Sequence, residues 1–412
     1  PRQETCSEMR IQHWLWTLVT LCIRLNVGWT HKVVSISYQD LANAFDNDDV
    51  DDSIRRNDEE TSCPQHLLAA IAEAFGPHGL GFLEVTDIPP RLVELRTRIL
   101  SLAPQVATLP TDQLDALTLP QTDFTIGWSH GKEQFGVDAS GQPIYDTRKG
   151  SFYLDPFRND NNVFPTKTLP SLEPALLELT HAMTQVAVWV SQLCDAFLHS
   201  TPTTNSHDHD RSSSSFSIHQ SIKSRINTKA RLLYYFPQQQ HESSQDNDVS
   251  AEDDWCGWHK DHGSLTVLVP GMLFHDKEQS SIEKASTYSK SSSSITSQQQ
   301  PQLKPGLYIQ TRTTENTSEH IKIVPIDLPP TSLGVQVGET VEIMSGGRMV
   351  ATPHAVMSRG NPMGGRASLA VFLQPERHQI LPPCPETADA SLRSRYRPTF
   401  GAFQQATTKA FQ

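Results

Sequence analysis

The sequence predicts an α+β fold, mainly β, in which a β-barrel or double-sheet jelly roll follows a helical N-terminal region. The first half of the chain holds two long amphipathic segments, Pro90–Ala107 and Pro174–Phe197, whose apolar spacing is typical of helices. The second half holds short segments that are rich in β-branched and aromatic residues and are separated by turn residues. Many short strands after a helical first half favour a barrel or jelly roll with helices at one end.

The individual elements follow from local patterns. Leu67–Phe75 has helical spacing and stops at Gly76 and Pro77, and Gly81–Val85 then reads as a strand. After the two long helices the predicted strands are Ala230–Phe236, Ser264–Leu268, Gly306–Gln310, Ile321–Pro325, Thr340–Met344 and Ala367–Leu373.

The chain has 412 residues, of which only 37% are hydrophobic. Four polar stretches account for this low fraction, because their composition buries too little apolar surface to offset the entropy of ordering. They are 46–62, 203–215, 238–254 and 276–304. Apolar segments resume on both sides of each stretch, so we interpret them as insertions within one fold. The expected organisation is an apolar N-terminal segment (1–32), a mixed helical region (33–225), a jelly-roll region (226–380) and a C-terminal tail (387–412).

The charge balance and the cysteines limit the possible partners and compartment. With 34 Lys and Arg against 46 Asp and Glu, the net charge is -12, which argues against binding to nucleic acid. The six cysteines are spread along the chain without a C-x-x-C pair, which favours a reducing compartment. His13–Val27 is an apolar run that is too short to span a membrane and is similar to the apolar region of a signal peptide. We expect a cytoplasmic monomer that does not bind membranes, with secretory or organellar targeting left open.

One segment carries the strongest chemical signal. His259 and Asp261 are two residues apart, and on a strand or its extended end this spacing points both side chains to one face. A third ligand, His354, would complete a two-histidine, one-carboxylate set, which leaves coordination positions open and suits a non-haem Fe(II). Arg366 and Ser368 follow on a predicted strand, where a guanidinium and a hydroxyl on one face can clamp a carboxylate.

These motifs together resemble the 2-oxoglutarate/Fe(II) oxygenases of the isopenicillin N synthase type. The matching elements are His259-x-Asp261, the segment from Gly338 to Gly347, His354, and Arg366-x-Ser368 with Phe372 and Pro375. Tyr234–Pro237 resembles the strand of that family that carries N-x-Y before a proline, although Leu233 stands at the Asn position. Asp261 and His354 are 93 residues apart, longer than is usual in the family; the 276–304 insertion and a second loop near 311–320 account for the excess.

The resemblance implies a double-stranded β-helix core and an enzyme with Fe(II), 2-oxoglutarate and O2 as cofactor and cosubstrates. His259, Asp261 and His354 would hold Fe(II), and Arg366, Ser368 and Tyr235 would hold the distal carboxylate of 2-oxoglutarate. The expected reaction is oxidation, most simply hydroxylation, of a small organic substrate with release of succinate and CO2. Three alternatives stay open: an Fe(II) oxidase of the same fold that does not use 2-oxoglutarate, a non-catalytic barrel that only binds, and another metal enzyme such as a zinc hydrolase.

Other residues give weaker signals. The His207–Asp210 tract lies in a Ser-rich stretch, and the acidic run at Asp46 lacks the oxygen ligands and glycine of a calcium loop, so we interpret both as solvated. Lys260 should point away from the two metal ligands beside it and therefore serve structure. Trp128, His130 and Lys132 are candidates for lining the substrate mouth.

Overall fold

The computed structural model describes residues 32–45, 63–137, 140–200, 216–237, 254–274, 304–311, 322–358 and 364–410. Residues Val33–Gln412 form one compact unit. The four predicted insertions lie outside the described residues, apart from Asp254 and Lys304, and so do the apolar run His13–Val27 and the His207–Asp210 tract.

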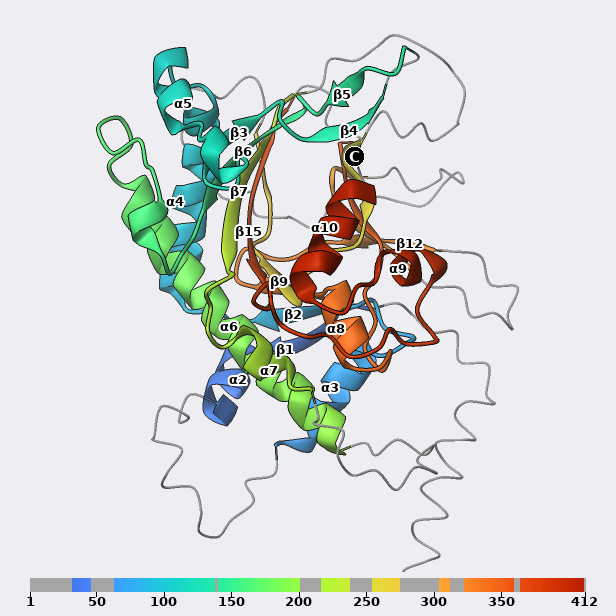
Figure 1. Ribbon diagram of the computed structural model, residues 1–412. Coiled ribbons are helices and arrows are strands. Elements are labelled where there is room, and N and C mark those ends of the chain that lie inside the picture. The colour runs from blue at the N-terminus through green and yellow to red at the C-terminus, as the bar shows by residue number, and fades with distance from the viewer. Residues whose placement is uncertain are drawn as a thin grey trace, which may run out of the picture. The chain divides into compact units, whose positions relative to one another are not determined.

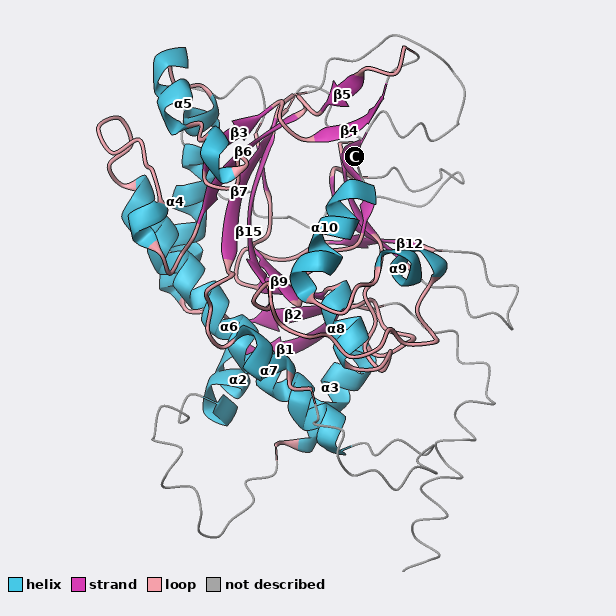
Figure 2. Ribbon diagram, viewed as in Figure 1, coloured by secondary structure: helices cyan, strands magenta, loops and turns pink. Residues whose placement is uncertain are grey.

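Most of the longer helices come from the N-terminal part of the chain, and in the described residues an uninterrupted run of strands from β7 to β13 follows α7, as Figures 1 and 2 show. The helices are α2 (Tyr38–Phe45), α3 (Gln65–Phe75), α4 (Pro90–Ala107), α5 (Thr111–Leu117), α6 (Leu172–Ser200), α7 (Ile218–Ile222), α8 (Glu339–Met344), α9 (Ala390–Arg395) and α10 (Phe400–Ala410). The strands are β1 (Val34–Ser37), β2 (Phe82–Thr86), β3 (Gly127–His130), β4 (Gln134–Val137), β5 (Pro143–Tyr145), β6 (Lys149–Leu154), β7 (Lys229–Tyr235), β8 (Asp254–His259), β9 (Leu265–Leu268), β10 (Met272–Leu273), β11 (Gly306–Gln310), β12 (Ile323–Ile326), β13 (Leu333–Val337), β14 (His354–Met357) and β15 (Arg366–Leu373).

Two sheets form the jelly roll. The large sheet has the strand order β1-β2-β13-β9-β15-β7-β6-β3, with β10 paired to β15. The small sheet has the order β12-β11-β14-β8, and β4 and β5 form a separate hairpin. The predicted fold class, an α+β jelly roll with supporting helices, is confirmed.

The alternation of side chains along the strands produces two apolar clusters, one on each face of the large sheet. On β7, Leu232 and Tyr234 join the cluster that includes α4 and α6, the helices seen along one face of the large sheet in Figure 1. Leu233 and Tyr235 join the other cluster, where they meet Trp255 and residues of the small sheet. The second cluster therefore marks the interior between the two sheets, where the candidate site lies.

Most predicted elements are present within a few residues of their expected bounds, but one is wrong. Thr340–Met344 was expected to be a strand and instead lies in α8. All six residues of α8 are buried, including the carboxylates of Glu339 and Glu342, so the apolar–polar alternation of this short segment does not mark a solvent-facing side. A turn follows this helix, in which Gly346 and Gly347 have φ angles of +64° and +80°, a conformation that favours glycine.

Two further expectations concern the compartment. None of the described helices is long and apolar enough to cross a membrane. The four cysteines within the described residues, Cys63, Cys194, Cys256 and Cys384, are all free thiols.

Candidate metal centre

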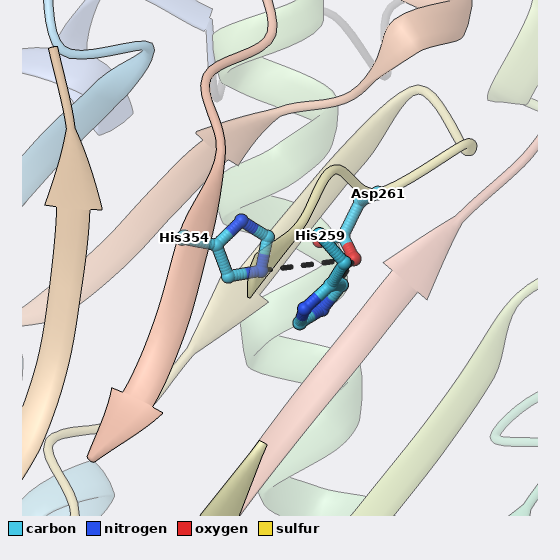
Figure 3. Close-up of side chains that lie close together, drawn as sticks. All are labelled: His259, Asp261 and His354. Carbon is cyan, nitrogen blue, oxygen red and sulfur yellow. Dashed lines mark ion pairs between the residues drawn. The ribbon is translucent and has the colours of Figure 1, made fainter. Parts of the chain in front are cut away.

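The structure brings His259 and Asp261, from one short stretch of the chain, together with the distant His354. His259 ends β8, His354 begins β14, and the two residues face each other across the antiparallel pair. Asp261 lies in the turn that leads from β8 to β9. One ligand atom from each residue lies within 4.8 Å of the other two, and Figure 3 shows the three side chains turned toward a common point.

The distances fit a single bound ion. Asp261 Oδ1 lies 3.9 Å from His259 Nε2 and 4.0 Å from His354 Nε2. Two atoms that each bind one ion at about 2.1 Å lie at most about 4.2 Å apart, so one ion can join Asp261 to either histidine. The three ligand atoms, which lie within 4.8 Å of one another, need to draw slightly closer to hold one ion jointly. A set of two imidazoles and one carboxylate on one side of an ion matches non-haem Fe(II) and leaves the opposite side open.

Each of these side chains has a second contact on the side away from the common point. His259 Nδ1 lies 2.8 Å from the carbonyl oxygen of Gly257. The Thr266 hydroxyl donates to Asp261 Oδ2 at 2.6 Å, and the Gln336 amide lies 2.5 Å from His354 Nδ1. The atoms left facing one another are therefore Oδ1 and the two Nε2 atoms.

The electrostatic environment keeps Asp261 ionised and His354 neutral at pH 7, which are the protonation states that a metal ligand needs. Burial alone would raise the pKa of Asp261, but both histidines and the Thr266 hydroxyl outweigh it and hold the pKa below its usual range. Burial and the nearby His259 lower the pKa of His354 to about 4, so its imidazole is neutral at pH 7. Burial would also lower the pKa of His259, but Cys256 and Asp261 raise it to about 9. Metal binding at neutral pH therefore displaces a proton from His259.

The turn that carries Asp261 is fixed by α8. The backbone N–H of Glu339 donates to the carbonyl oxygen of Asp261 at 2.8 Å, and the N–H of Gly338 donates to that of Ser264 at 2.9 Å. The Thr340 hydroxyl donates to the carbonyl oxygen of His262 at 2.6 Å. The segment that was mispredicted as a strand thus supports the metal-binding turn directly.

The C-terminal helices hold this assembly from outside. Arg395 on α9 makes a buried, two-pronged ion pair with Glu339, with N–O distances of 2.7 and 2.8 Å. Lys260 pairs with Asp389 at 2.6 Å, which is the structural role expected for it. The ring of His262 stacks on Phe400 of α10. The C-terminal tail of the sequence prediction is therefore part of the support of the site.

Arg366 and Ser368 lie on β15, two residues apart on the face toward the interior. Arg366 is 7% exposed, and within the described part of the chain its guanidinium has no hydrogen bond or ion pair. Burial lowers its pKa, and Arg96, whose pKa falls to about 10 through burial and the charge of Arg366, adds a second cation nearby. A buried guanidinium with open donors is suited to an incoming carboxylate.

Tyr235 faces Arg366 across the β7–β15 pair. The guanidinium carbon lies 5.5 Å from the centre of the Tyr235 ring, which also stacks on Trp255. Burial, together with Cys256, raises the pKa of Tyr235 to about 12, so the phenol keeps its proton and can donate. The structure thus gathers the three residues predicted to bind the carboxylate, with Tyr235 and Arg366 in contact.

A charged network that the sequence reading missed lines the same interior wall. Glu133 accepts from Arg231 and pairs with Lys149 at 3.2 Å, and Lys149 also pairs with Asp146 at 2.7 Å. A cleft is lined by Ser129, Gly131, Lys132, Glu133, Asp146, Lys149 and Ser151.

The three candidates for the substrate mouth are placed differently from one another. Lys132 lines this cleft. Trp128 instead packs in the helix-side cluster against Gly150, because the alternation on β3 turns Ser129 inward. His130 is exposed, and its Nε2 lies 3.0 Å from the carbonyl oxygen of Thr147.

Comparison with known proteins identifies the architecture. The sequence model of the 2OG-Fe(II) oxygenase superfamily matches residues 273–375. A search of curated proteins found no match.

Several solved structures share the fold. A full-length Neurospora crassa protein in complex with alpha-KG is 16% identical, with a TM-score of 0.55, and the alignment covers 92% of this chain and 96% of that one. A dioxygenase for auxin oxidation in rice is 17% identical, with a TM-score of 0.52 and coverage of 92% and 96%. JOX2, solved with 2OG, Fe and JA, is 16% identical, with a TM-score of 0.52 and coverage of 90% and 84%. At these identities the likeness establishes the fold.

Proposed function

Because the chain carries a domain of the 2OG-Fe(II) oxygenase superfamily, we propose that it oxidises, most simply by hydroxylation, a small organic substrate at a site built from His259, Asp261 and His354. One observation supports this proposal: the three metal-type ligands converge in the same interior in which the Arg366 guanidinium is buried with no hydrogen bond or ion pair to a described residue. This interior therefore offers groups suited to the metal and groups suited to the carboxylate of 2-oxoglutarate.

Fe(II), 2-oxoglutarate and O2 are the cofactor and cosubstrates of this superfamily, and when bound they supply oxidation of a C–H bond with release of succinate and CO2. In this chain, His259, Asp261 and His354 would hold the metal from one side and leave the other side free. Arg366 and Ser368, with the Tyr235 phenol, would hold the distal carboxylate of 2-oxoglutarate. The apolar neighbours Leu233 and Trp255 line the same interior and limit the access of water.

A small molecule is the substrate class that the surroundings support. The net charge of -12 disfavours polyanions. The Neurospora crassa protein has been solved with thymine, and JOX2 with JA, both small molecules. The Lys149–Glu133–Arg231 network makes one wall of the proposed substrate site polar.

The alternatives differ in what they bind and release. An oxidase of the same fold would take up O2 without turning over 2-oxoglutarate, since Arg366 and Ser368 do not distinguish the two. A non-catalytic barrel would bind neither the metal nor the cosubstrate productively. A zinc hydrolase would retain zinc and would not respond to 2-oxoglutarate.

The test is an anaerobic titration of the purified protein with Fe(II) and then 2-oxoglutarate, followed by a substrate screen in air scored by succinate. We expect a visible metal-to-ligand charge-transfer band that appears only with both additions, and succinate formation that rises with a suitable substrate. His354→Ala should lose the band, whereas His378→Ala, which removes a histidine whose side chain is 84% exposed, should keep it. Absence of the band and of succinate in the wild-type protein would refute the proposal.

A further inference from the structure

Thr266 and Gln336 form a pair directly opposite each other on neighbouring strands of the large sheet. Thr266 lies on β9 and Gln336 on β13, and the antiparallel register sets them face to face. Both side chains are buried, Thr266 at 5% and Gln336 at 1% exposure. Gln336 is the polar residue in the strand LGVQV, whose other side chains are apolar, so the interior must give it a partner.

Thr266 acts on the carboxylate of Asp261. Its hydroxyl donates to Oδ2 at 2.6 Å, while Oδ1 is the atom that faces both histidine Nε2 atoms. A carboxylate can rotate and exchange its two oxygens. The hydrogen bond removes this freedom and leaves Oδ1 directed at the ion position.

Gln336 acts on the imidazole of His354. Its amide lies 2.5 Å from Nδ1, and Nε2 of the same ring faces Asp261. The amide oxygen Oε1 is buried and has no hydrogen-bond partner among the described residues. A buried acceptor without a donor lowers the stability of the folded state. The amide group can therefore gain by rotating to an orientation in which its oxygen accepts a hydrogen bond.

The chemistry of metal binding identifies that orientation. A histidine that binds a metal through Nε2 must carry its ring proton on Nδ1, and that N–H requires an acceptor. Turning the Gln336 amide by half a turn places Oε1 at Nδ1, because the oxygen and nitrogen of an amide occupy nearly equivalent positions. With Nε2 of the amide at Nδ1, the ring proton would instead sit on the nitrogen that must bind the metal.

We propose that the Thr266–Gln336 pair positions the metal ligands: Thr266 fixes the rotation of Asp261, and Gln336 Oε1 fixes the tautomer and orientation of His354. The inference rests on the proposed function, because it assigns roles toward the metal of that site. It adds two positioning residues from the large sheet to a ligand set whose histidines belong to the small sheet. Neither residue touches the substrate or the metal itself.

The experiment measures metal affinity without turnover. Thr266→Val and Gln336→Met keep the volume of the side chain and remove the polar contact. Anaerobic titration with Co(II), followed by its visible absorption, should show a loss of about 10- to 100-fold in affinity for each variant. Thr266→Ser keeps the hydroxyl and should restore the wild-type affinity within about threefold.

Controls separate positioning from folding. Thr180→Val and Gln185→Met change a buried threonine and a partly buried glutamine of α6, in the helix layer, and should leave Co(II) affinity unchanged. Thermal unfolding of each metal-free variant shows whether it folds. If Thr266→Val and Gln336→Met fold and bind Co(II) as tightly as the wild type, the inference is wrong. If the wild type itself binds no Co(II), the proposed function fails instead, and the two failures are thereby distinguished.

Discussion

The large and the small sheet contribute different parts of the candidate site. The small sheet supplies the two histidines, at the end of β8 and the start of β14. The large sheet carries the residues proposed to bind the carboxylate, on β7 and β15, and supplies from β9 and β13 the contacts to Asp261 and His354. It also carries α4 and α6 on its other face.

The connections beside the strands of the two sheets also differ in length. The stretches 238–253, 275–303, 312–321 and 359–363, which lie outside the described residues, are each next in sequence to a strand of the small sheet. Three of them also follow or precede β7, β10 or β15 of the large sheet, whereas β2, β3, β6, β9 and β13 of that sheet adjoin none of them. The comparison teaches that long connections beside the histidines are compatible with the site, because the geometry of the histidines is set by strand pairing and by contacts from the opposite sheet.

The largest expected effect comes from releasing the turn that joins the two sheets. Arg395→Met leaves the Glu339 carboxylate buried without its partner, which typically costs about 3–5 kcal/mol in the free energy of unfolding. Because Glu339 also holds the carbonyl oxygen of Asp261, metal affinity should fall as well. Chemical unfolding and Co(II) titration measure the two losses.

The matched control for this change is Arg397→Met, which removes an exposed arginine that lies just after the same helix and donates to the carbonyl oxygens of Ser394 and Tyr396. It should have little effect on either quantity. The double variant Arg395→Met/Glu339→Leu removes both charges and should recover much of the lost stability. Unchanged stability of Arg395→Met would show that the turn is held without this ion pair.

The next effect isolates the large sheet. Arg366→Met removes the guanidinium, and two charge-assisted hydrogen bonds to a carboxylate are together worth about 3 kcal/mol, or about 100-fold in affinity. We therefore expect the KM for 2-oxoglutarate to rise by about that factor while Co(II) affinity stays as in the wild type. Arg98→Met, on the exposed side of α4, is the control. A parallel loss of metal affinity would contradict the assignment of carboxylate binding to the large sheet and of the metal-binding histidines to the small sheet.

The smallest effect concerns Asp146, in the charged network with Lys149, and it depends on pH. Burial alone would raise the pKa of Asp146, but the Lys149 ammonium and the Arg148 N–H outweigh it and hold the pKa below its ordinary value of 3.8. A carboxyl whose pKa is lower in the folded state stabilises the fold above its unfolded pKa, and this contribution is lost as the pH falls through the folded pKa. Asp146→Asn should thus cost about 1–2 kcal/mol at pH 7.

That difference from the wild type should shrink below pH 3.8 and vanish below the folded pKa of Asp146. Urea unfolding across this range measures it, with Asp112→Asn, the loss of an exposed carboxylate, as the control. A difference that stays constant into strong acid would contradict the assigned role of the charge.

The sequence was informative wherever a pattern is local. The spacing of apolar residues predicted α4 and α6, and the two-residue spacing of His259 and Asp261 predicted their convergence. The helix α8 was missed because burial of both its carboxylates depends on Arg395 and on the backbone of Ala351, which are distant in sequence. Gln336 was not identified from the sequence, because no strand was predicted at Leu333–Val337. Its contact with His354 depends on the packing of the large sheet against the small sheet, which residue spacing does not give.

The ion pair between Arg395 and Glu339 also has a consequence for the order in which the protein is made. All three metal ligands and the carboxylate clamp are synthesised before Arg395 and Phe400 leave the ribosome, yet the turn with Asp261 is secured from those later residues. A nascent chain that already contains every ligand still lacks the ion pair between Arg395 and Glu339, which stabilises the turn with Asp261. Synthesis interrupted after β15 would release a protein in which the turn with Asp261 lacks this ion pair. The metal site therefore reaches its final stability only after α9 and α10 have been synthesised and have packed.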